Sequence, residues 1–153
     1  YPPSHSRPPM RRVNPNLSDN KQILEGIYAR RISKATPALT VRRAALLAAG
    51  LFDESLGRRQ DFDLIVRLIR AGRCRSTDQV LWRKHWTEGA TTSRLDTFMD
   101  AILEMCRRQP DYMRDPRYRV GVARDLAHHT LKIVRHGRWD LVRRDLGRFA
   151  ERY

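Results

Sequence analysis

The chain has 153 residues, of which 41% are hydrophobic and 8% aromatic, so it can build one compact core and is too short for two comfortable domains. This composition excludes a disordered tail, a collagen-like repeat and a coiled-coil rod. No run of eighteen apolar residues occurs, which excludes a membrane span, and no apolar segment opens the chain, so we expect no signal peptide. The two cysteines, Cys74 and Cys106, are too few for a disulfide scaffold and lack metal-site spacing.

Lys and Arg number 31 against 17 Asp and Glu, which gives a net charge of +14, and by our count 27 of the 31 are Arg. The arginine fork grips phosphate in a bidentate way, which favours a nucleic acid or an anionic membrane surface as partner. The alternative is a compositional bias toward Arg and Ala. The excess charge is spread along the chain without a dense stripe or interleaved aromatics, so nucleic acid is the less favoured partner.

The first sixty residues combine an extended lead-in with short elements. Residues 1–17 hold five of the eight prolines and predict an extended lead-in or linker. Ser18 or Asp19 can cap a helix that runs to about residue 31. The apolar run 37–41 predicts a buried strand, and the Ala/Leu-rich segment 42–49 predicts a short helix.

The middle of the chain has the clearest periodicity. Phe62, Ile65, Val66 and Ile69 recur at helical spacing, which predicts an amphipathic helix from about Gln60 to Ala71 that Gly72 ends. Residues 73–86 read as extended chain around Val80, Leu81 and Trp82, and residues 87–93 read as a loop. Ser93 and Asp96 have the spacing of a capping box.

The last third predicts three helices: one from about Leu95 that Pro110 ends, one over 118–135, and one from Trp139 after a break at Gly137. Their expected inner faces are Leu95, Phe98, Met99, Ile102 and Cys106, then Val122, Leu126, His129 and Ile133, then Trp139, Val142, Leu146 and Phe149. His128 and His129 point about 100° apart on a helix, so they cannot chelate one ion, and we expect only His129 to face inward. The predicted fold class is α+β, mostly helical with a few short strands.

Four short motifs follow one another between residues 36 and 93. They are Val41-Arg42-Arg43, the turn Ala49-Gly50-Leu51-Phe52-Asp53-Glu54, the run Gln60-Asp61-Phe62-Asp63-Leu64 with Arg67, and Trp82-Arg83-Lys84-His85. In order and spacing they resemble the acceptor-side half of inverting family 2 glycosyltransferases with the GT-A fold, whose pattern is a "vrr" step, a "GGFDE" turn, an "ED-x-D-L-x-x-R" helix and a strand that closes in "YR-x-H". The resemblance implies three parts: the lead-in 1–17, an acceptor-side part 18–93 with short strands, and a helical extension 94–153.

The resemblance implies that Asp61 is the general base, which takes the proton of an acceptor hydroxyl as that hydroxyl attacks the anomeric carbon of the donor. A carboxylate in the first turn of a helix meets the positive end of the helix dipole and stays ionised near neutral pH. A helix start that faces a cleft can also bring it within about 3 Å of the hydroxyl. The alternative is that Asp61 only caps its own helix. The surrounding motifs favour the base.

The resemblance further implies an acceptor-binding site made of Gly50, Phe52, Asp53, Gln60 and Arg83. The ring of Phe52 would stack on the C–H face of a sugar and Asp53 would accept hydroxyl hydrogen bonds; the alternatives are a core position for Phe52 and a turn-closing role for Asp53. Gln60 stands where the family has Glu, which removes one negative charge. Gly50 is expected to need a positive φ. Arg83 can meet a phosphate or pair with an acid.

His85 matches the histidine that in some family members completes the metal site or touches the diphosphate, although a lone histidine is also a common structural residue. Asp61 and Asp63 spell the D-x-D of a metal site, but residues two apart on a helix diverge by about 200° and cannot hold one ion. In the family the metal-binding D-x-D lies at a strand end in the amino-terminal half, and residues 1–60 supply none.

We therefore expect this chain to be the carboxy-terminal part of a longer transferase, or the remnant of a truncated one, and to be inactive without a nucleotide-binding half. The complete enzyme would use a nucleotide-sugar donor, a divalent metal (Mn or Mg) and a carbohydrate, lipid or other hydroxyl acceptor, whereas this part needs no cofactor. The expected location is the cytoplasm, including peripheral contact with the inner face of the membrane. The alternative function is a basic helical domain that binds nucleic acid or an acidic protein.

Overall fold

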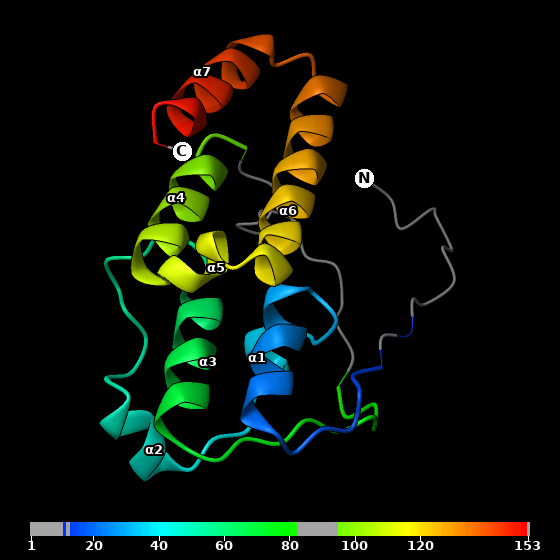
Figure 1. Ribbon diagram of the computed structural model, residues 1–153, viewed down its shortest axis with the longest axis vertical. Coiled ribbons are helices and arrows are strands. Elements are labelled where there is room, and N and C mark those ends of the chain that lie inside the picture. Colours follow the sequence, from blue (N-terminus) through cyan, green and yellow to red (C-terminus); the bar gives the residue numbers. More distant parts are fainter. Residues whose placement is uncertain (1–10, 12, 83–94, 153) are drawn as a thin grey trace, which may run out of the picture.

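The computed structural model describes residues 11, 13–82 and 95–152, and in this part of the chain the fold is all-helical, with 60% helix and no sheet. Figure 1 shows two stacked halves along the long axis of the molecule. One half holds α1 (Asn20–Tyr28), the 3-10 turn η1 (Thr36–Ala38), α2 (Arg43–Ala48) and α3 (Gln60–Ala71). The other holds α4 (Phe98–Arg108), α5 (Pro110–Arg114), α6 (Pro116–Arg135) and α7 (Trp139–Ala150).

The predicted α+β class is therefore wrong for the described residues. Instead of a strand over 37–41, Pro37 lies in the turn η1, where the amide of Leu39 donates to the carbonyl of Thr36 at 3.1 Å. Of the extended segment 73–86, residues 73–82 are described, and Ser76 forms only an isolated antiparallel bridge with Leu17. A strand needs a neighbour along its length to pair its backbone groups, and these segments have none among the described residues.

The helices of the first half begin largely where the sequence predicts. Asp19 caps α1, and its side chain accepts from the amide of Gln22 at 2.8 Å. The helix ends at Tyr28, earlier than predicted, because Arg30 takes a left-handed φ of 61°. α3 has the predicted bounds, and its four stripe residues are buried.

The second half confirms the three predicted helices and adds one. α5 is an extra short helix with Pro110 in its first turn, a position that tolerates proline. On α6, His129 is buried and His128 exposed, as predicted. The predicted inner face of α7 is right only in part: Val142 and Phe149 are half-buried, Trp139 and Leu146 are exposed, and the fully buried residues are Leu141 and Asp145. Ser93 of the predicted capping box lies outside the described residues.

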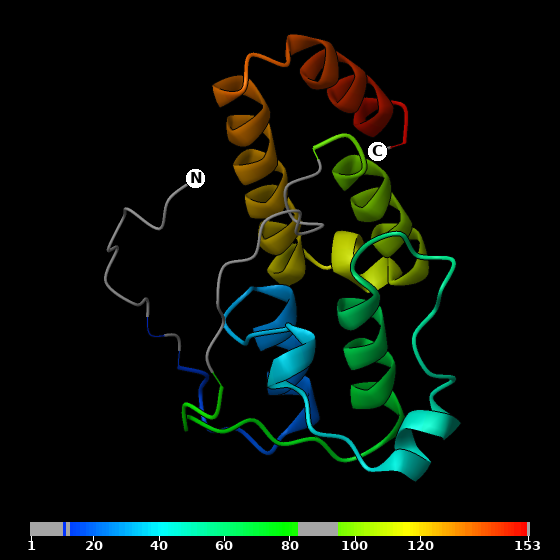
Figure 2. The same ribbon diagram turned by 180° about the vertical axis from the view of Figure 1, so that it is seen from behind.

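One hydrophobic core joins the two halves. Four aromatic rings from α1, α3, α5 and α6 meet at its centre, and they belong to Tyr28, Phe62, Tyr112 and Tyr118. Gly121 of α6 lies against the end of α1 so closely that an added Cβ would fall well inside the van der Waals contact distance from the Tyr28 carbonyl oxygen. Cys106 is buried in the same core, as expected of a small apolar side chain. Figure 2 shows the same end-to-end stacking from behind.

No helix in the described part of the chain is both long enough and apolar enough to cross a bilayer. The residues of the central core come from both sides of the predicted boundary between segments 18–93 and 94–153.

Candidate functional site

A pocket of about 340 Å³ opens at the amino-terminal end of α3. Its lining residues come from η1, the turn after α2 and the first turn of α3, and they are Thr36, Phe52, Gly57, Arg58, Arg59, Gln60 and Asp61. Three residues of the sequence-predicted site, Phe52, Gln60 and Asp61, therefore share one pocket. The Phe52 side chain is exposed, with 38% of the residue accessible, and Asp61 is half-buried. Phe52, Asp61, Arg58 and Arg59 thus share the pocket lining, and one oxygen of Asp61 already accepts from the amide of Phe62 at 2.8 Å, as the helix-capping alternative expects.

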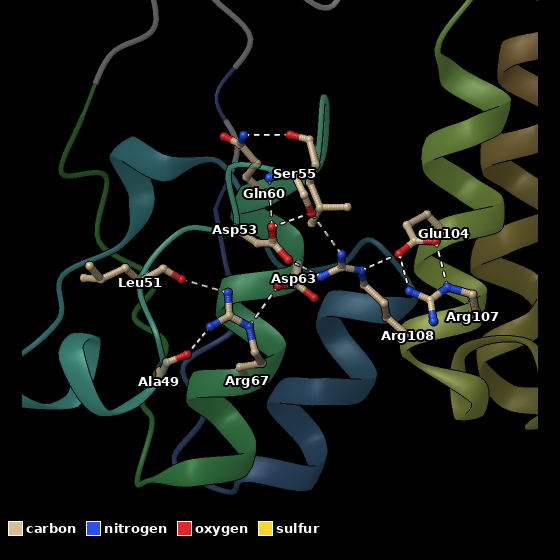
Figure 3. A network of polar contacts seen from close by, with 11 residues as sticks. Ala49, Leu51, Asp53, Ser55, Gln60, Asp63, Arg67, Glu104, Arg107 and Arg108 are labelled. Carbon is tan, nitrogen blue, oxygen red and sulfur yellow. Dashed lines mark hydrogen bonds and ion pairs between the residues drawn. The ribbon is translucent and has the colours of Figure 1, made fainter.

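Arg67 fastens the turn that carries Phe52 to α3. Its guanidinium donates to the carbonyls of Ala49 and of Leu51, the latter at 2.8 Å, and its Nε donates to the Asp63 carboxylate at 2.8 Å (Figure 3). Asp63 is buried, one helical turn before Arg67, so the carboxylate of this ion pair is shielded from water while the Arg67 side chain is part-exposed. The Asp63–Arg67 pair, which has the spacing "D-x-x-x-R" in the sequence, therefore holds the turn against α3.

The helix end that Arg67 braces has the form of a Schellman motif. The amide of Leu51 donates to the carbonyl of Leu46 at 3.1 Å, and the amide of Gly50 donates to that of Leu47 at 3.0 Å. Gly50 has a φ of 82°, which confirms the expected positive φ at this residue. Gly50 therefore shapes the turn that carries Phe52 and is not itself among the residues that line the pocket.

We expect Arg67→Lys to loosen this brace without removing its charge. Lysine can keep the ion pair with Asp63, but it cannot reach both carbonyls at once, so the free energy of unfolding should fall by about 1–2 kcal/mol. Chemical denaturation measures the loss, and hydrogen exchange should speed up at the amides of Gly50 and Leu51. Unchanged exchange at these two amides would contradict the bracing role.

The carboxylate of Asp53 is occupied by partners within the protein. Its carboxylate accepts from the hydroxyl of Ser55 at 2.6 Å and from its amide at 2.9 Å, and Arg108 of α4 donates to it at 2.5 Å. The hydrogen bonds from Ser55 and Arg108 lower the pKa of Asp53 to about 2. Arg108 also pairs with Glu104 at 2.6 Å (Figure 3). Asp53 therefore ties the turn to α4, which matches the turn-closing alternative, and it does not line the pocket.

Gln60 opens α3 and turns its side chain back on the preceding loop. Its Nε2 donates to the carbonyl of Leu56 at 2.7 Å, while the residue still lines the pocket. A glutamate, the family residue here, could not donate this hydrogen bond. The amide thus fits this loop in a way that the acid does not.

The two carboxylates of the D-x-D sequence have separate environments, as the helical spacing predicts. Asp61 lines the pocket, whereas Asp63 is buried against Arg67. Among the described residues, no group of three His, Cys, Asp or Glu side chains could hold a metal ion. Arg83 and His85 lie outside the described residues, so no step at this pocket is assigned to a metal.

A second polar cluster lies directly behind the pocket, and the sequence did not predict it. Asp125 of α6 is buried, and its two oxygens pair with Arg30 at 2.7 Å and with Arg59 at 2.5 Å. The hydroxyl of Tyr112 also donates to it at 3.3 Å. Burial by itself would raise the pKa of Asp125, but Arg59, Lys34 and Arg30 outweigh burial and lower it. Asp125 is therefore the ionised centre of a group of cations.

Lys34 is the unusual member of this group. Part of the residue reaches the surface, but its Nζ is shielded from solvent and has no hydrogen-bond partner among the described residues. The amine lies 4.1 Å from the centre of the Phe62 ring. Burial lowers the pKa of Lys34 to about 7, and repulsion by Arg59 adds to this effect. The residues next to Lys34 in the sequence do not predict that its amine is buried.

A buried His129–Asp145 pair joins α6 to α7, with 3.1 Å between Nε2 and the carboxylate. The ring of His129 stacks on Phe98 at 4.2 Å between centroids, and burial lowers its pKa. This pair explains why Asp145 faces inward on α7. It lies away from the pocket lining and fits a structural role.

Comparison of the chain with protein-family models, with curated proteins and with solved structures found no match.

Proposed function

We propose that the pocket at the start of α3 binds the hydroxyl-bearing acceptor of a family 2-like glycosyltransferase, with Asp61 as the general base. The supporting observation is that Asp61, Gln60 and Phe52, all singled out by the four ordered motifs, line one pocket. The Arg67 brace further supports it, because it fixes the turn that carries Phe52 relative to the helix that carries Asp61.

In this proposal the acceptor hydroxyl donates its proton to the Asp61 carboxylate as the hydroxyl oxygen bonds to the anomeric carbon of a nucleotide-sugar donor. The bond from that carbon to the donor's phosphate oxygen breaks, and the nucleoside diphosphate leaves with the electron pair. The ring of Phe52 gives the sugar an apolar surface on which to stack. The donor is held by a nucleotide-binding unit, for which these residues supply only the acceptor side.

The binding part of this proposal is tested by NMR titration of the chain with neutral monosaccharides. We expect shifts confined to the amides around Phe52, Gly57 and Asp61, and Phe52→Ala should weaken binding about 3- to 10-fold through loss of ring contact. Trp139→Ala is the matched control, because it removes an aromatic residue of α7 that is 59% exposed. Absence of shifts at the pocket with every sugar would sink the acceptor site.

The catalytic part is tested by Asp61→Asn in an enzyme that joins this chain to a donor-binding unit. Loss of the proton acceptor should lower the transfer rate about 10²- to 10⁴-fold, while acceptor shifts persist. The chain by itself should not bind UDP at micromolar concentration, and if it does, the division into donor and acceptor parts is wrong. Nucleic-acid binding that weakens by decades between about 50 and 200 mM salt would favour the alternative basic domain.

A further inference from the structure

Two buried cationic nitrogens behind the pocket have no hydrogen-bond partner in the described part of the chain. They are Nζ of Lys34 and Nη1 of Arg59. Both groups lie against the same ring: Nζ is 4.1 Å from the centroid of Phe62, and Cζ of Arg59 is 5.8 Å from it. A buried donor without a partner costs free energy, and two such cations side by side repel one another. An anion bound to both nitrogens would accept their hydrogen bonds and reduce the repulsion between the two charges.

The protein's own carboxylates do not supply this anion. Both oxygens of Asp125 are already taken by Arg30 and by Nη2 of Arg59. Asp61 lies close enough to favour the charged amine of Lys34, yet it forms no hydrogen bond with that amine. Three cations thus surround one buried carboxylate, with Asp61 at the pocket side. The cluster keeps a positive excess.

We infer that Lys34 and Arg59 form the binding site for a phosphoryl group that enters through the pocket at the start of α3. Arg59 itself lines the pocket and directly precedes α3, in whose first turn the Asp61 carboxylate accepts from the amide of Phe62 at 2.8 Å. A phosphoryl group accepts from a guanidinium and from an ammonium together, and its negative charge offsets the cluster, in which Arg30, Arg59 and protonated Lys34 outnumber Asp61 and Asp125 by one. This inference rests on the proposed function, and it places a phosphate on the acceptor or on another ligand that occupies the same pocket.

Binding to this site should be coupled to protonation of Lys34. The groups that face its amine are Arg30, Arg59, Asp61 and Asp125. A phosphate added beside the amine raises the pKa of Lys34 from about 7, so at pH 8 the protein takes up a proton as the anion binds. Proton uptake distinguishes this site from arginines on the surface, because those stay charged with or without the anion.

The test is calorimetric titration at pH 8 with inorganic phosphate, a hexose monophosphate and UDP, each in two buffers of different ionisation enthalpy. For wild type we expect binding of inorganic phosphate and of the hexose phosphate with a buffer-dependent enthalpy. Lys34→Met should weaken both at least 10-fold and remove the buffer dependence. Lys21→Met, the same charge loss at an exposed site on α1, should leave both unchanged, and circular dichroism confirms that each variant is folded.

The inference is overturned if wild type binds no phosphate at ligand concentrations up to about 10 mM, which corresponds to the weakest dissociation constant that we would count as a site. Equal binding by Lys34→Met and Lys21→Met overturns it too, because the anion then binds elsewhere. Phosphate binding without any neutral-sugar shifts would reject the acceptor proposal and keep this site; sugar shifts without phosphate binding would do the reverse. Tighter binding of UDP than of the hexose phosphate assigns the phosphoryl group to a nucleotide and rejects the acceptor-borne source.

Discussion

Lys34→Met is expected to stabilise the free protein by about 4 kcal/mol at pH 7. The pKa of Lys34 is 10.5 in an unfolded chain and about 7 in the folded protein, and one pKa unit corresponds to about 1.4 kcal/mol. Folding near pH 7 must therefore either strip the proton from the amine or bury the charge without a partner. Methionine has nearly the same shape and no charge, so it avoids this cost beside the ring of Phe62.

The sign of the pH dependence follows from proton counts. Between pH 7 and about 10 the unfolded chain holds the Lys34 proton and the folded protein does not, so the stability of wild type rises with pH, by up to about 1.4 kcal/mol per pH unit from this residue. Below pH 7 both states are protonated and the cost is constant. The advantage of Lys34→Met should therefore shrink steadily from pH 7 to 10.

Urea denaturation of both proteins in phosphate-free buffers at several pH values measures this difference. Lys21→Met again serves as the control, and its stability should follow that of wild type across the range. A Lys34→Met protein that is less stable than wild type at pH 7 would mean that the amine is satisfied within the folded protein, and the anion site proposed behind the pocket would then be untenable.

Gly121→Ala is expected to destabilise the protein by about 3–5 kcal/mol or to prevent folding. The new Cβ would clash with the backbone carbonyl of Tyr28, whose carbon lies 3.0 Å from its position, and would come within 3.5 Å of the Tyr112 ring. A backbone cannot swing aside as a flexible side chain can, so α6 must move off α1 and open the aromatic centre of the core.

Gly147→Ala on α7 is the matched control for Gly121→Ala. Nothing lies within 4 Å of its added Cβ, so only helix propensity changes, and alanine should add about 0.5–1 kcal/mol of stability. Thermal unfolding followed by circular dichroism compares the two variants. A melting temperature of Gly121→Ala close to that of wild type would show that the contact between α1 and α6 is looser than this packing.

The sequence predicted the helices because their apolar spacing is a local property. The stripe from Phe62 to Ile69 locates α3 without knowledge of its neighbours, and Asp19 marks the start of α1. Strands need a partner segment, so the apolar run 37–41 could not be judged locally and formed a turn at Pro37. On α7 the buried polar pair of His129 and Asp145 rotated the inner face away from the apolar pattern.

The residues of the candidate site likewise fall into those that the sequence predicted and those that it did not. Motif order led to Asp61, Gln60 and Phe52, which do share a pocket, and to Gly50, whose φ is positive as expected. Lys34, Arg59 and Asp125 were missed because their significance depends on burial where three distant segments meet. The left-handed φ of 63° at Arg59, a residue type that rarely adopts it, leaves no mark in the sequence.

The meeting of Tyr28 with Tyr112 and Tyr118 at the centre of the core has a consequence for biosynthesis. Tyr28 lies 4.8 Å, between ring centroids, from each of two rings that follow it by more than eighty residues. The first helices therefore leave the ribosome before the residues that cover them have been made. Their apolar faces therefore stay uncovered until translation has passed Tyr118, so this core can close only after the start of α6 has been made.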